Sequence, residues 1–240
     1  MTGTGAAIVF GATGAIGRAV TARLLEERTF ARVFAASRSG TTDLAGAVPL
    51  WFDLADEASI AAALRKIELP LHHVFVATGM LHNDACGVAP EKSWRGIDAQ
   101  AMADVFVVNA IGPALLAKHC LPLFPRDRRA VFAALSARVG SIGDNRLGGW
   151  HSYRASKAAL NMLMRNFAIE LARSHPLALA VALHPGTVDS GLSAPFQRGV
   201  APDKLFSPDQ SAGYLLDVLG RLSPGDSGGL FAWDGTRLTF

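Results

Sequence analysis

The sequence contains few of the residues that build metal centres or disulfide frameworks. Its 240 residues include only two cysteines, Cys86 and Cys120, and these lack the spacing of metal ligands. The seven histidines are scattered along the chain, and none pairs at ligand spacing beside a third donor. We therefore predict no metal site, and we expect both thiols to be free in a reducing compartment.

Charge of one sign, long apolar runs and targeting signals are also scarce. With 23 Lys and Arg against 20 Asp and Glu, the formal net charge is +3, and no basic run occurs. Such a chain is not expected to bind nucleic acid or a membrane surface. No stretch approaches the roughly 20 apolar residues of a membrane span, and the first residues lack the basic region of a signal peptide. The sequence thus predicts a cytoplasmic protein without a membrane partner.

Short apolar runs instead alternate with longer helical patterns along the whole chain. Strands are predicted at residues 6–10, 31–37, 47–53, 72–79, 130–136, 177–186 and 229–233. Helices are predicted at residues 14–28, 55–67, 99–120, 151–174 and 208–222. This alternation implies right-handed crossovers and a parallel sheet covered on both faces. We predict one α/β domain over residues 1–240, with a doubly wound parallel sheet of about seven strands.

A glycine-rich turn, "GATGAIG", lies between the first predicted strand and the first helix. Gly11 allows a tight turn, Gly14 lets backbone approach a pyrophosphate, and Gly17 lets the helix sit close to the sheet. Thr13 adds a hydroxyl, and the helix N-terminus stabilises negative charge. In this context the turn predicts a nucleotide site, with a plain turn as the alternative.

The ends of the second and third strands indicate which nucleotide binds. Ser37 and Arg38 follow the second strand, where an acidic residue would hold a ribose 2′-hydroxyl. Arg38 suits a 2′-phosphate, so we expect NADP (NADPH) rather than NAD, the alternative being a solvated loop arginine. Asp53 ends the third strand, where it either reaches the adenine amino group or caps the next helix, with Asp56 as its rival for that cap.

Tyr153 and Lys157 lie four residues apart near the start of a predicted helix and so share one face. A lysine ammonium one turn away from a phenol lowers the phenol pKa by stabilising the phenolate. The phenol can then exchange a proton with a carbonyl or alcohol oxygen while hydride moves at the adjacent carbon. The pair predicts acid/base chemistry on a small-molecule carbonyl or alcohol substrate.

Taken together, these motifs resemble those of the short-chain dehydrogenase/reductase family over essentially the whole chain. The resemblance rests on "GATGAIG", "SRS", "FDL", "ATG", "NAIGP", "LSARVGSI", "YRASKAALN" and "HPGTV", which occur in family order. The long run "LSARVGSIGDNRLGGWHSYRASKAALN" and the ending "FAWDGTRLTF" are most similar to the branch of C-factor and the sniffer-like carbonyl reductases. The resemblance implies a single Rossmann-type domain.

It also implies roles for individual residues. Tyr153 would be the acid/base, Lys157 would hold the nicotinamide ribose, Asn109 would shape a helix that orders a relay water, and Ser136 would orient the substrate. Implied cofactor contacts come from Gly11, Thr13, Gly14, Ala15, Ile16, Ser37, Arg38, Asp53, Leu54, Ala77, Thr78, Gly79, Asn109, Tyr153, Lys157, Pro185, Gly186 and Val188.

The chain departs from the family pattern at three places. Ala15 stands where the family has its middle glycine, and Ala77 replaces a structural asparagine, which is expected to weaken a sheet contact. The interval from Ser136 to Tyr153 is also longer than is usual in the family. Ala137 then falls at the usual serine position, and Ser141 is a rival to Ser136.

The leading hypothesis is therefore an NADP(H)-dependent oxidoreductase acting on a carbonyl or alcohol. Two alternatives stay open: a C-factor type signalling protein with little turnover, and an epimerase-like or redox-sensing relative. We expect a homodimer or homotetramer, because the helices bearing Asn109 and Tyr153 are apolar beyond one stripe. The pocket wall is expected at Met80–Asn83, Arg146–Trp150 and Asp189–Phe206.

Overall fold

A computed structural model describes residues 3–240, and its centre is an eight-stranded sheet. The strand order is β10-β9-β6-β5-β4-β1-β2-β3, and all neighbours are parallel except β10 and β9. The strands are β1 Ala6–Phe10, β2 Arg32–Ser37, β3 Ala47–Trp51, β4 Leu71–Val76, β5 Ala130–Leu135, β6 Ala178–His184, β9 Leu230–Ala232 and β10 Arg237–Leu238. A separate two-stranded sheet pairs β7 Thr187–Val188 with β8 Leu205–Phe206.

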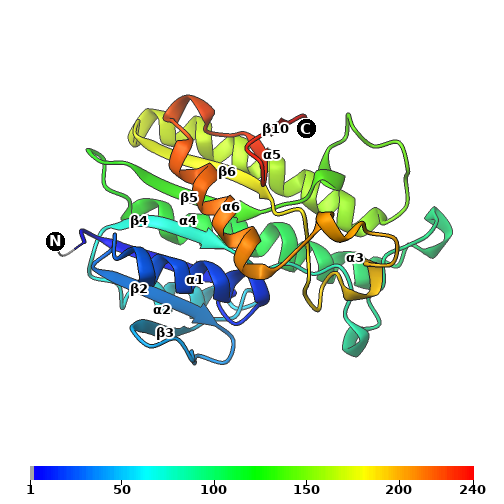
Figure 1. The fold of residues 1–240 in the computed structure, drawn as a ribbon, viewed down its shortest axis with the longest axis horizontal. Helices are drawn as coiled ribbons and strands as arrows, with labels where there is room; N and C mark the ends of the chain where they lie inside the picture. Colours follow the sequence, from blue (N-terminus) through cyan, green and yellow to red (C-terminus); the bar gives the residue numbers. More distant parts are fainter. Residues whose placement is uncertain (1–2) are drawn as a thin grey trace.

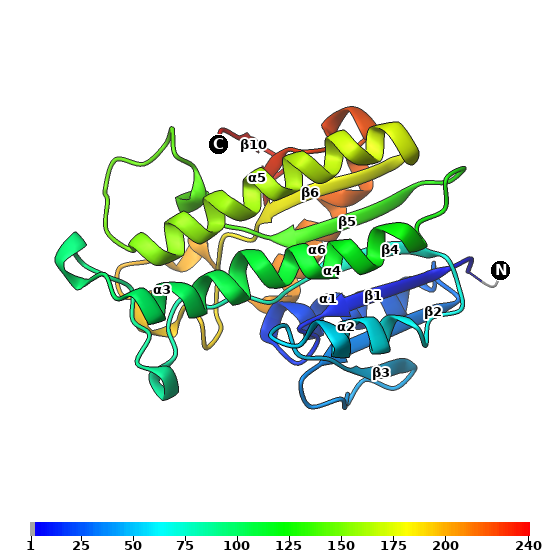
Figure 2. The same ribbon diagram turned by 180° about the vertical axis from the view of Figure 1, so that it is seen from behind.

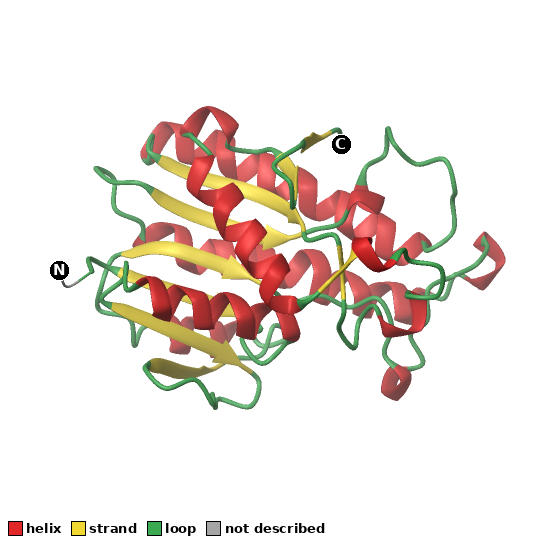
Figure 3. Cartoon of the chain, viewed as in Figure 1, coloured by secondary structure: helices red, strands yellow, loops and turns green. Residues whose placement is uncertain are grey.

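Helices cover both faces of the large sheet (Figures 1 and 2). One face carries α1 Ala15–Glu27 and α6 Pro208–Arg221, and the other carries α2 Glu57–Leu64, α4 Gly112–Cys120 and α5 His151–Ser174. Helix α3, Ala99–Phe106, precedes α4. Short 3-10 helices occupy Asp84–Cys86, Trp94–Gly96, Leu121–Leu123, Arg138–Gly140, Ala194–Phe196, Pro202–Lys204 and Pro224–Asp226. Figure 3 shows short red helical pieces between the green loops.

The central strands are apolar because both of their faces are covered. Every residue of β1 and β5 is buried, as expected for parallel strands between two helical layers. At one edge of the sheet, the side chains near the end of β3 alternate between exposed and buried, and Trp51 is half exposed. The predicted doubly wound α/β domain is confirmed. The sheet has one more strand than expected, because the chain turns back at Gly235 to add the antiparallel β10.

Helix α5 begins and ends at the predicted residues, whereas α2 is shorter than predicted. Helix α2 begins after Asp56, whose side chain accepts a hydrogen bond from Ala58 N. Of the two candidate caps, Asp56 is therefore the one used. Asp53 instead accepts from Ala55 N at 2.9 Å.

The predicted helix at residues 99–120 is continuous but not uniform. Its middle, Val107–Ile111, is a π-helical turn that joins α3 to α4. By length and composition alone, the helical segment Ala99–Leu123 could cross a membrane, which the sequence analysis did not anticipate. In the structure, Leu116 and Cys120 on its inner face are fully buried in the core. Packing of this kind is typical of a core helix.

Candidate active site

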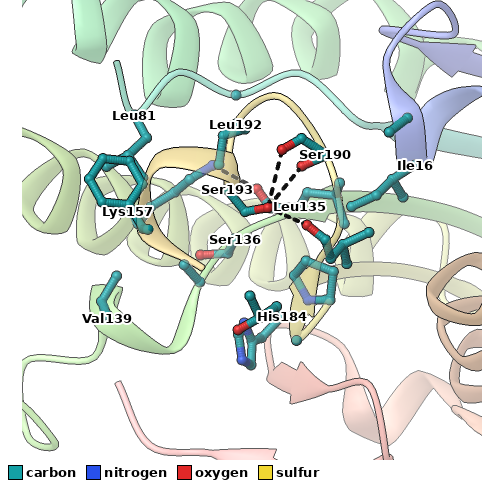
Figure 4. Close-up of a pocket in the computed structure, with 18 of the residues that line it drawn as sticks. Ile16, Leu81, Leu135, Ser136, Val139, Lys157, His184, Ser190, Leu192 and Ser193 are labelled. Carbon is teal, nitrogen blue, oxygen red and sulfur yellow. Dashed lines mark hydrogen bonds between the residues drawn. The ribbon is translucent and has the colours of Figure 1, made fainter. Parts of the chain in front are cut away.

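A cavity of about 590 Å³ opens beyond the carboxyl ends of β1, β4, β5 and β6. Its walls come from separate parts of the chain, including Gly14–Ile16, Ala77–Gly79, Leu135–Val139 and residues 184–188. Figure 4 shows Ile16 on one side of the cavity, and Leu81, Val139 and Lys157 on the other. The parallel strands thus bring the predicted motifs to one place.

The glycine-rich turn has the close backbone approach that its spacing predicts. Gly11 has a φ of +80°, and a Cβ added at Gly17 would lie 2.2 Å from the Gly11 carbonyl oxygen. Gly14 precedes α1 and provides no side-chain cap. The first N–H groups of α1 therefore remain available to an anion.

The loop after β4 passes directly over this turn. Ala77 N donates to Phe10 O at 2.8 Å, and the Ala77 methyl lies 3.1 Å from a Cβ built at Gly17. A larger side chain at residue 77 would press on the turn, so the alanine fits this contact. Thr78 Oγ1 is buried and has no hydrogen-bond partner among the described residues. Together with Gly79, Thr78 lines the cavity.

The residues expected at the adenosine end lie outside the lining of this cavity. Ser37 is buried and its hydroxyl pairs with Ser39 at 3.0 Å. Arg38 is exposed and forms no ion pair with the described residues. Asp43, the first carboxylate after β2, is occupied by Arg18 at 2.6 Å. Arg38 is therefore a free cation just beyond the end of β2.

Other expected contacts are divided between the cavity and its surroundings. Gly11, Thr13, Asp53 and Leu54 do not line the cavity, whereas Ala15, Ile16, Pro185, Gly186 and Val188 do. Gly186 has a φ of +77°, and a Cβ there would meet Phe206 at 2.6 Å. The segment after β6 therefore passes close to β8 and needs glycine at this position.

Tyr153 and Lys157 lie in the first two turns of α5 and face the cavity together. Their side chains are almost fully buried, and Lys157 Nζ is 5.7 Å from the centre of the Tyr153 ring. Lys157 Nζ donates to Leu135 O at 2.8 Å, which holds it at the end of β5.

The pKa values of this pair correct one expectation. Burial raises the pKa of Tyr153 to about 12 and lowers the pKa of Lys157 to about 7. The predicted lowering of the phenol pKa is therefore not seen in the polypeptide alone. The reason is that both groups leave water together, which disfavours the phenolate as well as the ammonium.

Asn109 lies in the π-helical turn and is completely buried. Its side chain accepts from Met80 N and donates to Met80 O, both at 2.8 Å. It also donates to Ser156 Oγ at 3.0 Å. Asn109 thus ties the loop after β4 to α5, and it does not itself line the cavity.

The two serine candidates and the alanine at the usual serine position differ in their contacts. Ser136 lines the cavity, but its hydroxyl donates to Asn161 Oδ1 at 2.7 Å. Ser141 is buried away from the cavity, and its hydroxyl accepts from Asp144 N. Ala137, at the usual serine position, packs against Tyr153 and Leu81. Of the two candidate serines, Ser136 is therefore the one that lines the cavity, although its hydroxyl already donates to a partner.

The outer wall comes from the three predicted segments. Leu81, Trp150 and Phe196 each contribute an apolar side chain to the lining. The Trp150 ring lies 5.1 Å from the Phe196 ring and 6.2 Å from the Tyr153 ring, between centroids. An apolar substrate face beside the phenol follows from this arrangement.

Sequence reasoning missed His184 and Val139, which also line the cavity. Burial lowers the pKa of His184 to about 4, and its Nδ1 has no partner among the described residues. Its place directly before Pro185 was the available signal. Among residues 3–240 no group of three His, Cys, Asp or Glu side chains is arranged to hold a metal ion.

Comparison with known proteins identifies the family of the chain. The sequence profile of the short chain dehydrogenases matches residues 5–200. The chain belongs to the short-chain dehydrogenase family. It is 32% identical over 180 residues, 75% of this chain and 73% of the relative, to 1-hydroxy-2-glutathionyl-2-methyl-3-butene dehydrogenase of Rhodococcus sp. (strain AD45). It is 34% identical over 142 residues, 59% of this chain and 80% of the relative, to C-signal of Myxococcus xanthus.

Solved structures of the family support the same assignment. An NADPH-bound carbonyl reductase from chicken fatty liver superposes with a TM-score of 0.86 at 26% identity, covering 99% of this chain and 100% of that one. The resemblance to the family, and to the branch of C-factor and the sniffer-like carbonyl reductases, is confirmed. As a short-chain dehydrogenase, the protein is an oxidoreductase of a family that uses a nicotinamide cofactor and small-molecule substrates.

The described residues fit such a cofactor. Gly11 and Gly17 let the turn pack closely without side chains, and the start of α1 offers free N–H donors. The unpartnered hydroxyl of Thr78 and the buried ammonium of Lys157 face the same cavity.

Proposed function

We propose that the protein is an NADPH-dependent carbonyl reductase with Tyr153 as its acid/base. The observation that carries this proposal is the buried Tyr153–Lys157 pair, placed in one cavity with the glycine-rich turn. A protein that only binds a nucleotide needs neither residue in this relation.

Reduction requires a proton donor at the carbonyl oxygen, and the structure supports Tyr153 in this role. With a pKa near 12 the phenol is protonated at neutral pH, which is the form that an acid needs. A reduced nicotinamide cofactor, held by the glycine-rich turn and by residues 185–188, would supply the hydride for the carbonyl carbon. Lys157 lies beside the ring, so an ammonium there stabilises the phenolate that remains after proton transfer. A proton relayed from solvent then restores the phenol, and Lys157 keeps its own proton.

Other residues position the substrate and the cofactor. Trp150 and Phe196 pack against the substrate and exclude water, and Ser136 orients the substrate from the end of β5. In the direction of alcohol oxidation, Ser136 Oγ can still accept a hydrogen bond from the substrate hydroxyl while it donates to Asn161. Asn109 keeps the π-helical turn in place, beside which a relay water is held.

A preference for NADP over NAD is supported by Arg38. A 2′-phosphate carries charge that this unpaired guanidinium can bind through two hydrogen bonds. No carboxylate directly follows β2, and Asp43 is already paired with Arg18. Ser37, Asp53 and Leu54 complete the adenosine end in this proposal.

A homodimer or homotetramer is supported by the outer face of the helical layer. Ile111, Met162 and Ile169 are 49%, 62% and 43% exposed on the helices that follow Asn109 and Tyr153. A second copy packed there would bury these side chains. We infer a cytoplasmic location for the assembly.

The experiment that tests the function is NADPH oxidation by the wild-type protein over a panel of carbonyl compounds, with Tyr153→Phe as the blank. Phenylalanine keeps the ring contacts with Trp150 and removes only the proton donor. General acid catalysis contributes about 10²–10⁴-fold, so turnover should fall that far. NADPH binding, measured by fluorescence, should stay near wild type.

The relative C-signal supports a second candidate, a signalling role with little turnover. If the wild-type protein binds NADPH but oxidises it with no carbonyl of the panel, this candidate replaces the reductase. If Tyr153→Phe turns over as fast as wild type, the assigned acid/base is wrong.

A further inference from the structure

Glu91 is a buried carboxylate that the catalytic scheme does not use. It lies in the loop between β4 and α3 and is only 8% exposed. No Lys, Arg or His of residues 3–240 forms an ion pair with it. A buried carboxylate is costly unless other groups satisfy its oxygens. The groups that bind the Glu91 carboxylate therefore indicate its structural role.

The partners of Glu91 are all at the start of α5. Both carboxylate oxygens accept from Ser152 N at 3.2 Å, and Oε1 also accepts a short hydrogen bond from Ser152 Oγ. The main-chain oxygen of Glu91 accepts from Trp150 N at 2.6 Å. Glu91 thus holds the residues on both sides of His151.

Helix α5 depends on this remote partner because it has no cap of its own. Trp150 precedes the helix with a φ of +49° and makes no side-chain cap. In contrast, α2 and α3 are capped by Asp56 and Asp98, each directly before its helix. A carboxylate at a helix N-terminus is favoured by the unpaired N–H groups and the helix dipole. At α5 this carboxylate comes from 61 residues earlier in the chain.

The contact joins two walls of the active site. The residue after Ser152 is Tyr153, and Trp150 lines the cavity beside it. The other end of the Glu91 loop carries Leu81, which packs against Tyr153. Movement of the loop away from α5 would therefore shift the phenol, its aromatic neighbour and its apolar contact together.

We propose that Glu91 is a positioning residue, which fixes the first turn of α5 and thereby the hydroxyl of Tyr153 and the ring of Trp150 in the cavity. The proposal rests on the proposed reductase function for its kinetic consequence, but the positioning itself is a property of the fold. Ser152 acts as the second half of the contact.

The kinetic test compares Glu91→Ala and Glu91→Gln with wild type. Misplacement of a reacting group by about 1 Å can cost about 100-fold in rate. We expect Glu91→Ala to lower kcat 10- to 100-fold and to raise KM for the carbonyl, while Kd for NADPH stays within two-fold. Glu91→Gln keeps one acceptor for Ser152 and should recover part of kcat. In the Glu91→Ala background, Ser152→Ala should cause little further loss.

The matched control is Asp98→Ala, which removes a cap from α3 without touching α5. It should leave kcat within two-fold. If Glu91→Ala also keeps kcat within two-fold, or if kcat falls only with a parallel loss of NADPH affinity, the proposal is overturned.

A second measurement does not depend on turnover. The chain has only two tyrosines, Tyr153 and Tyr214, so 3-fluorotyrosine labelling gives two ¹⁹F signals that Tyr153→Phe assigns. Glu91→Ala should shift or broaden the Tyr153 signal and leave that of Tyr214 unchanged, and Asp98→Ala should change neither. An unchanged Tyr153 signal overturns the positioning role even if the protein reduces no carbonyl. If the wild-type protein shows no turnover but the Tyr153 signal still shifts in Glu91→Ala, the reductase function is rejected and the positioning role stands.

Discussion

The two sides of the cavity are built in different ways. On the cofactor side, Gly11–Gly17 and Ala77–Gly79 directly follow β1 and β4, and the fit depends on backbone and very small side chains. On the substrate side, the loops at 80–98, 137–150 and 189–206 contribute side chains that meet across long sequence separations. The cofactor side is thus fixed by strand ends. The substrate side depends on contacts between loops, and can vary without change to the sheet.

On the cofactor side, we expect the largest effect from the substitution of Arg38, which should weaken cofactor binding. Loss of a charge-assisted hydrogen bond costs about 1.5–3 kcal/mol. Arg38→Ala should therefore weaken NADPH binding about 10- to 100-fold and leave NADH binding unchanged, as measured by fluorescence titration. Arg32→Ala, at the exposed far end of the same strand, is the control. Equal or tighter binding of NADH by wild type would contradict the assignment.

These differences also explain what the sequence could predict. The glycine turn, the Tyr153–Lys157 pair and the start of α5 at His151 follow from local patterns, because each lies within a few residues of a strand or helix end. The parallel pairing of the strands follows from the alternation of strands and helices and from the right-handed crossovers that it implies.

The remaining features depend on partners that are distant in the sequence. The sequence around Ser136 does not show that Asn161 will accept a hydrogen bond from its hydroxyl. The sequence around Trp150 likewise does not show that Glu91 caps α5. Periodicity alone reveals neither the π-helical turn at Asn109 nor the two bonds of this side chain to Met80. The pKa of Tyr153 follows from burial, which requires the folded chain.

The next prediction tests whether the cofactor side needs the close backbone contact between Gly11 and Gly17. In Gly17→Ala the new Cβ would lie 2.2 Å from the Gly11 carbonyl oxygen, so the turn must move. Overpacking of this kind costs about 1–3 kcal/mol, and NADPH affinity should fall with the free energy of unfolding in urea. The control is Gly220→Ala in α6, where no atom lies within 4 Å and alanine should stabilise the helix by up to about 1 kcal/mol. A Gly17→Ala protein as stable as wild type would show that the turn is not rigid.

A smaller effect concerns Lys157, which lies between the two sides. Burial lowers its pKa to about 7 in the folded protein, so between pH 7 and its ordinary value near 10.5 the unfolded chain binds one more proton. The free energy of unfolding without cofactor should therefore rise with pH from 7 to 9, by up to about 1.4 kcal/mol per unit. Lys157→Met should remove this slope, and exposed Lys204→Met should keep it.

The experiment ends at pH 9 because a second buried group, the Cys120 thiol, affects stability above that pH. Burial raises the pKa of the Cys120 thiol, so above pH 9 the unfolded chain loses a proton that the folded one keeps, and this offsets the rise in stability that comes from Lys157. A flat profile for wild type between pH 7 and 9 would mean that Lys157 remains charged in the folded protein.

The smallest effect distinguishes the two serines on the substrate side. Ser136→Ala should lower turnover roughly five-fold, in line with one hydrogen bond of about 1 kcal/mol. Ser141→Ala should change it less than two-fold, because that hydroxyl serves only Asp144 N. Steady-state kinetics at saturating NADPH separate the two. The reverse order of effects would place Ser141 at the substrate.

The strand order has a consequence for how the chain is synthesised. Strand β4 pairs with β1 on one side, but 53 residues separate the end of β4 from the start of its other neighbour, β5. At about 5–20 residues per second, a nascent chain holds an unpaired, apolar β4 edge for roughly 3–10 s before β5 leaves the ribosome. Such an edge is prone to join other chains. The crossover that carries Glu91 and Asn109 therefore sets the length of the period in which a newly made molecule is most open to aggregation and to chaperones.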